Sequence, residues 1–431
     1  MGRPGRPEYI PAQFGRAAAR PCGPQFEPHR LAQPPRDGSA VRRPQRRTAR
    51  IFHRMVGETV TRGRRHRGNA AMTDFDVIVI GGGIIGCLVA REVIARGMDV
   101  SVALLDRDLV GSGASRRSAG LHFPRGASAR VRAMTAVSQD YYQRLRRDHP
   151  DLPIHPLEMS VLARESEGVD RYYLDRANAT RVAGLPGDSV PVPPGMGVWN
   201  VDGGHYADVA ALVVALTAEL RQRVHIREST AVTAVEPGRD EVVVRLGTGE
   251  TLCAATVFLA PGPWVHAPAW RAVTAPLAVR VKLVAAMHID QAPTASDRVI
   301  VFQDPDAFLL PMAHRGHWLF SFTSQQWDVE PDALTGGASA ACLAEGRDVL
   351  AAVAPRLAAR ATAGRVFCDA YSPNREPLIR ALDPDRRVIF AGAANGSGYR
   401  LAPAIAAEAV DLLSIGPARR PLHVDHPIRS R

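Results

Sequence analysis

Lysine is almost absent from this sequence: Lys282 stands alone against 53 arginines among 431 residues. This bias fits a GC-rich genome better than adaptation to a ligand. Cysteine is also scarce, with five residues and no CxxC pair, which argues against a disulfide framework or a zinc site and favours a reducing, cytoplasmic location. No metal site is expected. No run reaches the roughly 18 to 20 apolar residues needed to cross a bilayer, so no membrane span is expected.

The net positive charge of the chain comes from its first 71 residues. The formal net charge is +11, but residues 1–71 hold 16 arginines and four acidic residues, which leaves the remainder at −1. A nucleic-acid partner is therefore not expected. Residues 1–71 are rich in proline, glycine and arginine and are predicted to be disordered. Met72 is a plausible natural start, so this segment is interpreted as a dispensable extension, with a functional basic arm as the alternative.

The rest of the chain is organised around Asp76-Val-Ile-Val-Ile-Gly81-Gly-Gly83-Ile-Ile-Gly86. The unbroken apolar run 77–80 is typical of a strand buried on both faces. Gly81 permits a tight turn, Gly83 lets the backbone approach a pyrophosphate, and Gly86 lets the following helix pack against the strand. The amides at the start of that helix would face the phosphates.

A second strand strengthens this motif. Residues 100–105 are mostly apolar and end at Asp106, whose carboxylate can accept hydrogen bonds from a ribose. Strand, glycines, helix, strand and carboxylate in this order predict a dinucleotide site. At this point NAD and FAD both remain open, and the alternative is a glycine-rich turn that binds nothing.

The remaining elements alternate between two groups. Helices are expected at 84–97, 128–147, 209–223, 339–359 and 404–413. Strands are expected at 157–164, 224–227, 231–235, 241–246, 255–259, 279–289, 299–302, 307–310, 318–323 and 386–391. The strands from 224 to 259 are interpreted as one β-meander, and the four strands from 279 to 323 as one antiparallel sheet.

This order predicts an α/β protein with a Rossmann-type FAD-binding domain and an inserted antiparallel-sheet α+β substrate domain. Residues 72–127, 200–268 and 385–416 would form the FAD-binding domain. Residues 128–199 and 269–384 would form the substrate domain, followed by a tail at 417–431. A plain NAD dehydrogenase usually completes its sheet with consecutive βαβ units, so the interleaving favours a flavin fold.

Seven segments, in order, resemble the D-amino-acid oxidase superfamily of FAD-dependent oxidoreductases, which includes glycine oxidase, monomeric sarcosine oxidase and bacterial D-amino-acid dehydrogenases. These segments are 76–86, Asp106, Gly111-Ser-Gly-Ala-Ser115, Asp202-Gly-Gly204, Ala260-Pro-Gly-Pro-Trp264, Tyr371-Ser-Pro-Asn-Arg-Glu-Pro377 and Gly396-Ser-Gly-Tyr-Arg-Leu-Ala-Pro403. The first and the last are specific, and the others are persuasive together.

The resemblance implies a set of FAD-binding residues. They are Gly81, Gly83, Ile84, Ile85, Gly86, Asp106, Arg107, Ser112, Ala114, Ser115, Val232, Gly262, Gly396, Ser397, Gly398, Tyr399, Arg400 and Leu401. In the family the turn before the last helix lies beside the pyrimidine edge of the flavin. The helix starting near Leu401 would then stabilise negative charge on the reduced ring.

The resemblance also implies a substrate site. Arg400 takes the place of a basic residue that binds the substrate carboxylate, for which a guanidinium is well suited; a surface or phosphate role is the alternative. Tyr371 matches a position that faces the substrate, or is simply a buried tyrosine. His122 and Arg125 could edge this site, although surface roles are preferred for them.

Lys282 is the third catalytic candidate. In sarcosine-oxidase-like relatives a lysine that activates oxygen lies on a later strand, and residues 317–322 have none. Lys282 lies on an earlier strand that passes near the flavin in dehydrogenase-like relatives, so oxygen and a quinone both remain open as electron acceptor. Cys368 is one residue out of register with the cysteine that carries covalent flavin, so non-covalent FAD is favoured.

The predicted activity is therefore oxidation of a C–N bond in an amino acid or amine. The α-hydrogen would leave as hydride to the flavin, and the imine would be hydrolysed. This needs no strong protein base, in keeping with the lack of an evident His/carboxylate dyad. A 2-hydroxyacid (C–O) dehydrogenase and a flavin-free interaction protein with a basic arm are the alternatives.

Overall fold

The computed structural model describes residues 73–164, 166–186, 190–304, 306–334 and 337–413, which all belong to one compact unit, residues 68–431. The disorder predicted for residues 1–71 and the tail predicted at 417–431 lie outside the described residues. Among the helices in these ranges, none is long and apolar enough to cross a membrane.

A mainly parallel sheet is built around β1 (Phe75–Ile80). β1 pairs in parallel with β2 (Val102–Leu105) on one side and with β12 (Thr251–Leu259) on the other. β9 (Val224–Arg227) extends the sheet beyond β2, and β19 (Val388–Gly392) extends it beyond β12, again in parallel. Residues 77–80 of β1 are at most 4% exposed, which confirms the prediction of a strand buried on both faces.

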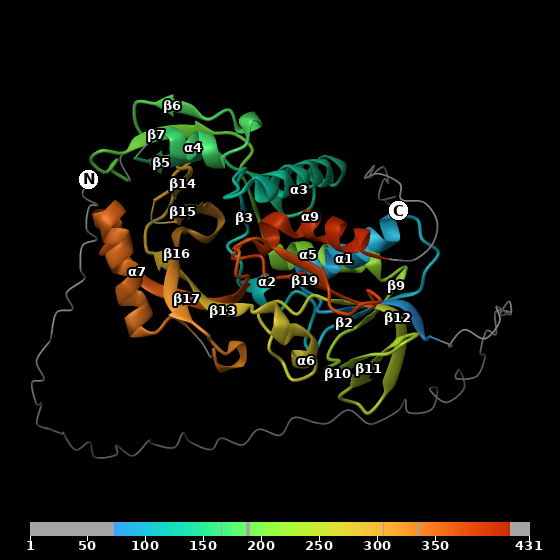
Figure 1. Ribbon diagram of the computed structural model, residues 1–431. Helices are drawn as coiled ribbons and strands as arrows, with labels where there is room; N and C mark the ends of the chain where they lie inside the picture. Colours follow the sequence, from blue (N-terminus) through green and yellow to red (C-terminus); the bar gives the residue numbers. More distant parts are fainter. Residues whose placement is uncertain (1–72, 165, 187–189, 305, 335–336, 414–431) are drawn as a thin grey trace, which may run out of the picture. The chain divides into compact units, whose positions relative to one another are not determined.

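Four helices cover one face of this sheet. α1 (Ile84–Ala95), α3 (Ala129–Asp148), α5 (Val209–Leu220) and α9 (Gly398–Asp411) share one hydrophobic core with the residues of β1 that point toward them. α9 packs against both α1 and α3, so the end of the chain completes the layer begun by its first helix (Figure 1). The other face is covered by the hairpin of β10 (Val232–Pro237) and β11 (Val242–Leu246) and by Leu277 and Val279.

The expected meander from 224 to 259 is only partly correct. β9 is not in it, because α5 delivers β9 to the free edge of β2, where it pairs in parallel. β10, β11 and β12 form the meander. The first half of β12 pairs with β11 and its second half pairs with β19, so the meander is continuous with the parallel sheet.

The second sheet has eight strands. Their spatial order is β17 (Ala361–Tyr371), β13 (Arg280–Ile289), β16 (His317–Trp327), β15 (Ala307–Met312), β14 (Val299–Phe302), β5 (Met159–Ala163), β7 (Gly197–Val201) and β6 (Thr180–Val182). The four strands expected from 279 to 323 are antiparallel neighbours, as predicted. The sheet is nevertheless not purely antiparallel, because β14 and β5 are parallel. β17 was not predicted.

Helix α7 (Ala340–Val353) covers the face of the second sheet formed by residues such as Met287 and Phe322 (Figure 1). The helix expected at 339–359 is broken, because Pro355 disfavours the helical conformation of Ala354 before it. A separate turn, α8 (Pro355–Ala358), follows.

Short elements complete the described residues. A third sheet contains β3 (Leu121–His122), β8 (His205–Ala207) and β4 (Ile154–Pro156), and β18 (Leu378–Ala381) pairs with β19. The short helices are α2 (Ala114–Arg117), α4 (Ser166–Tyr172), α6 (Arg271–Thr274), η1 (Asp175–Ala177), η2 (Ala275–Leu277), η3 (Ala313–Arg315) and η4 (Pro331–Ala333).

α9 begins at Gly398, earlier than the predicted start near 401–404, and Pro403 lies inside it. A proline cannot donate to the carbonyl four residues before it, which here belongs to Tyr399. The hydroxyl of Tyr142 on α3 donates to that carbonyl instead (2.7 Å). Proline is therefore tolerated because a neighbouring helix replaces the missing donor.

These two linked sheets confirm the predicted fold class, a Rossmann-type α/β fold carrying a second, largely antiparallel sheet. The exact domain boundaries stay predictions.

Candidate functional site

The glycine-rich turn after β1 is held by contacts that exclude larger residues. Gly81 has a φ of +104°, and a Cβ on it would lie 2.2 Å from the carbonyl oxygen of Ala260. A Cβ on Gly86 would lie 1.9 Å from the carbonyl oxygen of Gly81. α1 can therefore start directly against the end of β1 only because both positions are glycine.

Two side chains hold the same turn from outside. The Ser115 hydroxyl accepts a hydrogen bond from the Ile84 N–H (2.9 Å), and the Asp106 carboxylate accepts from the Gly82 N–H (2.7 Å) and the Asp108 N–H (2.8 Å). Burial raises the pKa of Asp106, and these two N–H donors oppose the rise. Because a carboxylate offers about four acceptor sites, Asp106 can accept further bonds from a ribose hydroxyl.

A cavity of about 320 Å³ opens beside this turn. Fifteen of the predicted FAD-binding residues line it: Gly81, Gly83, Ile84, Ile85, Gly86, Asp106, Arg107, Ser112, Ala114, Ser115, Val232, Gly262, Gly396, Gly398 and Tyr399. The other three, Ser397, Arg400 and Leu401, line a second cavity.

This second, larger cavity has a volume of about 1100 Å³ and lies between the second sheet and the start of α9. Its walls include Lys282, Tyr371 and Arg400, the three predicted catalytic residues. Four residues line both cavities: Ser118, Phe367, Gly396 and Tyr399. The two cavities therefore meet at the turn that precedes α9.

Arg400 is held by neutral groups. One guanidinium nitrogen donates to the Ser397 hydroxyl (2.7 Å) and another to the carbonyl oxygen of Arg125, while the group lies 5.0 Å from the centre of the Phe123 ring. Burial, with a smaller contribution from the charge of Arg125, lowers the pKa of Arg400 to about 10. No carboxylate of the described residues forms an ion pair with Arg400, so its charge is available to an anion in the larger cavity.

Tyr371 and Lys282 lie on adjacent strands of the second sheet. The ammonium of Lys282 is 4.6 Å from the centre of the Trp327 ring and 5.9 Å from that of Tyr371. Burial lowers the pKa of Lys282 and raises that of Tyr371. A Cβ placed on Gly396 would be 3.2 Å from the Tyr371 hydroxyl, so this hydroxyl adjoins the turn before α9. Both side chains border the larger cavity and not the smaller one.

Asp369 was missed by the sequence reasoning. It lies on β17 and lines the smaller cavity, where its carboxylate accepts hydrogen bonds from the Gly396 N–H (2.8 Å) and the Ala370 N–H (2.8 Å). Burial raises its pKa to about 6, although both donors oppose the rise. On a strand, Asp369 shares a face with Phe367 and with the predicted site residue Tyr371. Recognising β17 as a strand would therefore have made Asp369 a candidate.

The surface roles preferred for His122 and Arg125 are wrong. His122 is completely buried and stacks on His205, with 4.5 Å between ring centres, and His205 is hydrogen bonded to the Tyr399 hydroxyl (2.9 Å). Burial is the main cause of the lowered pKa of His122 and of the value of about 3 for His205. Arg125 lines the larger cavity and pairs with Asp306 (3.1 Å).

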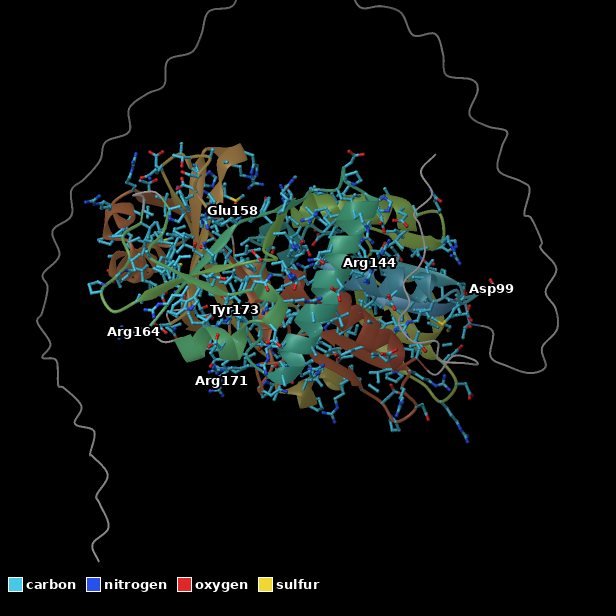
Figure 2. The ribbon with its side chains drawn as sticks, turned by 90° about the horizontal axis from the view of Figure 1, so that it is seen from above. Asp99, Arg144, Glu158, Arg164, Arg171 and Tyr173 are labelled. Atoms are coloured by element: carbon cyan, nitrogen blue, oxygen red, sulfur yellow. The ribbon has the colours of Figure 1, made fainter. Side chains whose placement is uncertain are left out.

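Figure 2 shows the second sheet and α3 from above, with Tyr173 near the junction between them.

Within the described ranges, no group of three or more His, Cys, Asp or Glu residues is placed to hold a metal ion.

The walls of the smaller cavity fit an FAD molecule. A Cβ on Gly262 or Gly398 would meet no protein atom within 4 Å, so the backbone there borders the smaller cavity directly. This is what close approach of a phosphate or a flat ring requires. Asp106 at one end and the start of α9 at the other supply the acceptor and the donors for a dinucleotide.

Comparison with solved structures shows the same fold in several flavoenzymes. Glycine oxidase from Geobacillus kaustophilus is 19% identical, with 79% of this chain and 95% of that chain covered and a TM-score of 0.62. L-proline dehydrogenase from P. horikoshii is 16% identical, with 80% and 95% covered and a TM-score of 0.66. L-α-glycerophosphate oxidase from Mycoplasma pneumoniae, solved with FAD bound, is 16% identical, with 80% and 96% covered and a TM-score of 0.65.

A comparison with curated proteins gives no significant match. The family described as FAD dependent oxidoreductase (DAO) matches residues 76–412, most of the chain and all of the elements that line the two cavities. This chain therefore belongs to the DAO family of FAD-dependent oxidoreductases, and FAD is its cofactor.

Proposed function

We propose that this enzyme oxidises a C–N bond in an amino acid or in a primary or secondary amine. The observation that carries the proposal is the position of Arg400. Its guanidinium lacks a carboxylate partner among the described residues and borders the larger cavity, close to the place where that cavity meets the cofactor cavity. A substrate carboxylate bound there would hold its α-carbon near the junction.

The chain itself would bind and orient the substrate. Arg400 has N–H groups left for a carboxylate after its bonds to Ser397 and Arg125. The Tyr371 hydroxyl, kept protonated by burial, can hydrogen bond to the amine or the carboxylate. FAD, when bound, would supply the acceptor for the hydride that leaves the α-carbon, and water would hydrolyse the resulting imine.

No strong base is required if the neutral amine is selected and held in place. Among the described residues that line the larger cavity there is no histidine, and its two carboxylates are paired: Asp306 with Arg125, and Asp304 with Arg164. The residues that line the larger cavity therefore favour a role for the protein in positioning the substrate rather than in removing a proton from it.

A panel of amino acids and amines, added without oxygen to the FAD-bound enzyme, tests this proposal. We expect at least one compound to bleach the visible absorption band of the flavin and to yield a keto acid or an aldehyde. A panel that never bleaches the band would refute C–N oxidation. Reoxidation by air, compared with reoxidation by a quinone, would then identify the acceptor, for which we propose oxygen or a quinone.

A C–O substrate is the second candidate, because the fold is shared with L-α-glycerophosphate oxidase as well as with amine-oxidising enzymes. The same panel should therefore include 2-hydroxyacids. Bleaching by these compounds alone would favour the alternative.

We also propose that FAD is held without a covalent bond. Cys368 is 4% exposed, packs in the core beneath the first sheet and does not line either cavity. Boiling should release FAD into the supernatant, and flavin that stays with the precipitated protein would contradict this.

A further inference from the structure

The larger cavity carries more positive charge than one carboxylate requires. Among the residues that the structure describes, six cationic side chains line it: Arg117, Arg125, Arg280, Lys282, Arg375 and Arg400. Its two carboxylates, Asp304 and Asp306, pair with Arg164 and Arg125, and Arg280 pairs with Asp328 outside the wall.

Lys282 differs from the exposed Arg117 and Arg375 because it is buried. The residue is 6% exposed, and within the described residues its ammonium forms no hydrogen bond or ion pair, although the charges of Asp306 and Glu345 act on it from a distance. Its ammonium instead lies over the rings of Trp327 and Tyr371. An aromatic face offsets only part of the cost of burying a charge, so a buried lysine that lines a cavity is a site for an anion.

Tyr371 lies near the surroundings of both cations, Lys282 and Arg400. The centre of its ring is 5.9 Å from the ammonium of Lys282, and its hydroxyl adjoins Gly396. The next residue, Ser397, accepts a hydrogen bond from Arg400. Burial is the main cause of the lowered pKa of both Lys282 and Arg400, and the charge of Asp306 opposes the fall at both. Lys282 and Arg400 are therefore two cations of one cavity wall, carried by different elements, β13 and α9.

We propose that the substrate is a dicarboxylic amino acid or amine, with one carboxylate at Arg400 and a second, distal carboxylate at Lys282. This inference rests on the proposed function, because it places the reacting C–N bond beside Arg400. Arg375 is exposed at the edge of the cavity and would assist entry of the distal group. A distal ammonium is disfavoured, because Lys282 already occupies the aromatic faces of Trp327 and Tyr371.

Binding of unreactive acids to the FAD-bound enzyme tests the inference without turnover. Succinate is compared with butyrate, and glutarate with valerate, by their perturbation of flavin absorption. A buried, charge-assisted pair predicts that each dicarboxylate binds about 10- to 100-fold more tightly than its monocarboxylate. Lys282→Met should abolish the difference while leaving monocarboxylate binding unchanged.

Two further variants keep the result interpretable. Arg375→Gln, at an exposed position, should lower the preference about threefold. Arg144→Met removes a positive charge from α3, away from both cavities, and should leave the preference unchanged (Figure 2). Equal affinities in the unmodified enzyme, or an equal loss of both acid classes in Lys282→Met, would overturn the inference.

The substrate panel separates this inference from the proposed function. Bleaching by glutamate or aspartate with a lower KM than glutamine or asparagine would support both. Bleaching that is indifferent to the distal charge would leave C–N oxidation standing and overturn the inference. A lysine-dependent preference for dicarboxylates without bleaching by any amine would support the anion site and refute C–N oxidation.

Discussion

The carboxyl group of Asp369 should make the stability of the FAD-free enzyme depend on pH. Asp369→Asn replaces it with a neutral group of almost the same shape. The amide oxygen can still accept the hydrogen bond from Gly396, which the carboxylate accepts now. The amide nitrogen would face the Ala370 N–H, to which the carboxylate now offers its other oxygen, and this loss does not depend on pH. The pH dependence of the comparison therefore reports the charge.

The sign follows from the direction of the pKa shift. Asp369 titrates at about 6 in the folded state, against 3.8 for an unburied aspartate, so the folded protein holds this proton more tightly than the unfolded chain. The extra stability from this bound proton is fully present below pH 3.8 and is lost as the pH rises through 6. Above that pH no further change is expected. At 1.36 kcal/mol per pH unit, the difference amounts to about 3 kcal/mol.

Denaturant unfolding of both proteins across this pH range measures the effect. We expect the free energy of unfolding of the unmodified enzyme, relative to Asp369→Asn, to fall by about 2 kcal/mol between pH 4 and pH 7, which is most of the total. Asp99→Asn, at the edge of the molecule in Figure 2, is the control and should show no such trend. A difference between the enzyme and Asp369→Asn that does not change with pH would refute the reasoning.

Two predictions concern the start of the first helix and the last helix. Gly86→Ala places a methyl group 1.9 Å from the Gly81 carbonyl oxygen, so it should cost about 3 kcal/mol of stability or more. The purified protein should also contain little FAD. Denaturant unfolding measures the first effect and flavin content the second. Tyr142→Phe removes the donor to the buried Tyr399 carbonyl and should cost about 1 to 3 kcal/mol, measured by unfolding.

Matched variants control for both changes. Gly168→Ala adds a methyl group where no atom lies within 4 Å and should retain FAD. Tyr141→Phe removes a half-buried hydroxyl that accepts from Arg91 and should cost less than Tyr142→Phe, because Arg91 keeps Glu219 as a partner (3.9 Å). Normal FAD content in Gly86→Ala, or an equal cost for the two tyrosine changes, would contradict these predictions.

The parts of the fold that could be predicted are those fixed by local sequence. The apolar run of β1 needs burial on both faces, and the glycines after it permit contacts that no other residue allows. These requirements arise within a few residues of the chain. For this reason the strand, the turn and the following helix could be placed before any tertiary contact was known.

The parts that were missed depend on distant partners. β17 contains Thr362, Gly364 and Arg365, has no clear alternation of apolar residues, and is a strand because it pairs along its length with β13. β9 belongs to the parallel sheet because α5 precedes it, which its four residues do not reveal. α9 extends past Pro403 because Tyr142, more than 250 residues earlier, supplies a donor.

β17 links the cofactor cavity to the substrate cavity. Side chains two residues apart on a strand point to the same face, and here Phe367 lines both cavities, Asp369 only the smaller and Tyr371 only the larger. β17 is paired with β13, which carries Lys282 opposite Asp369. A register shift of one residue would turn the β17 side chains to the other face. The register of these two strands, rather than the glycine-rich turns, therefore sets where a substrate would lie relative to the flavin.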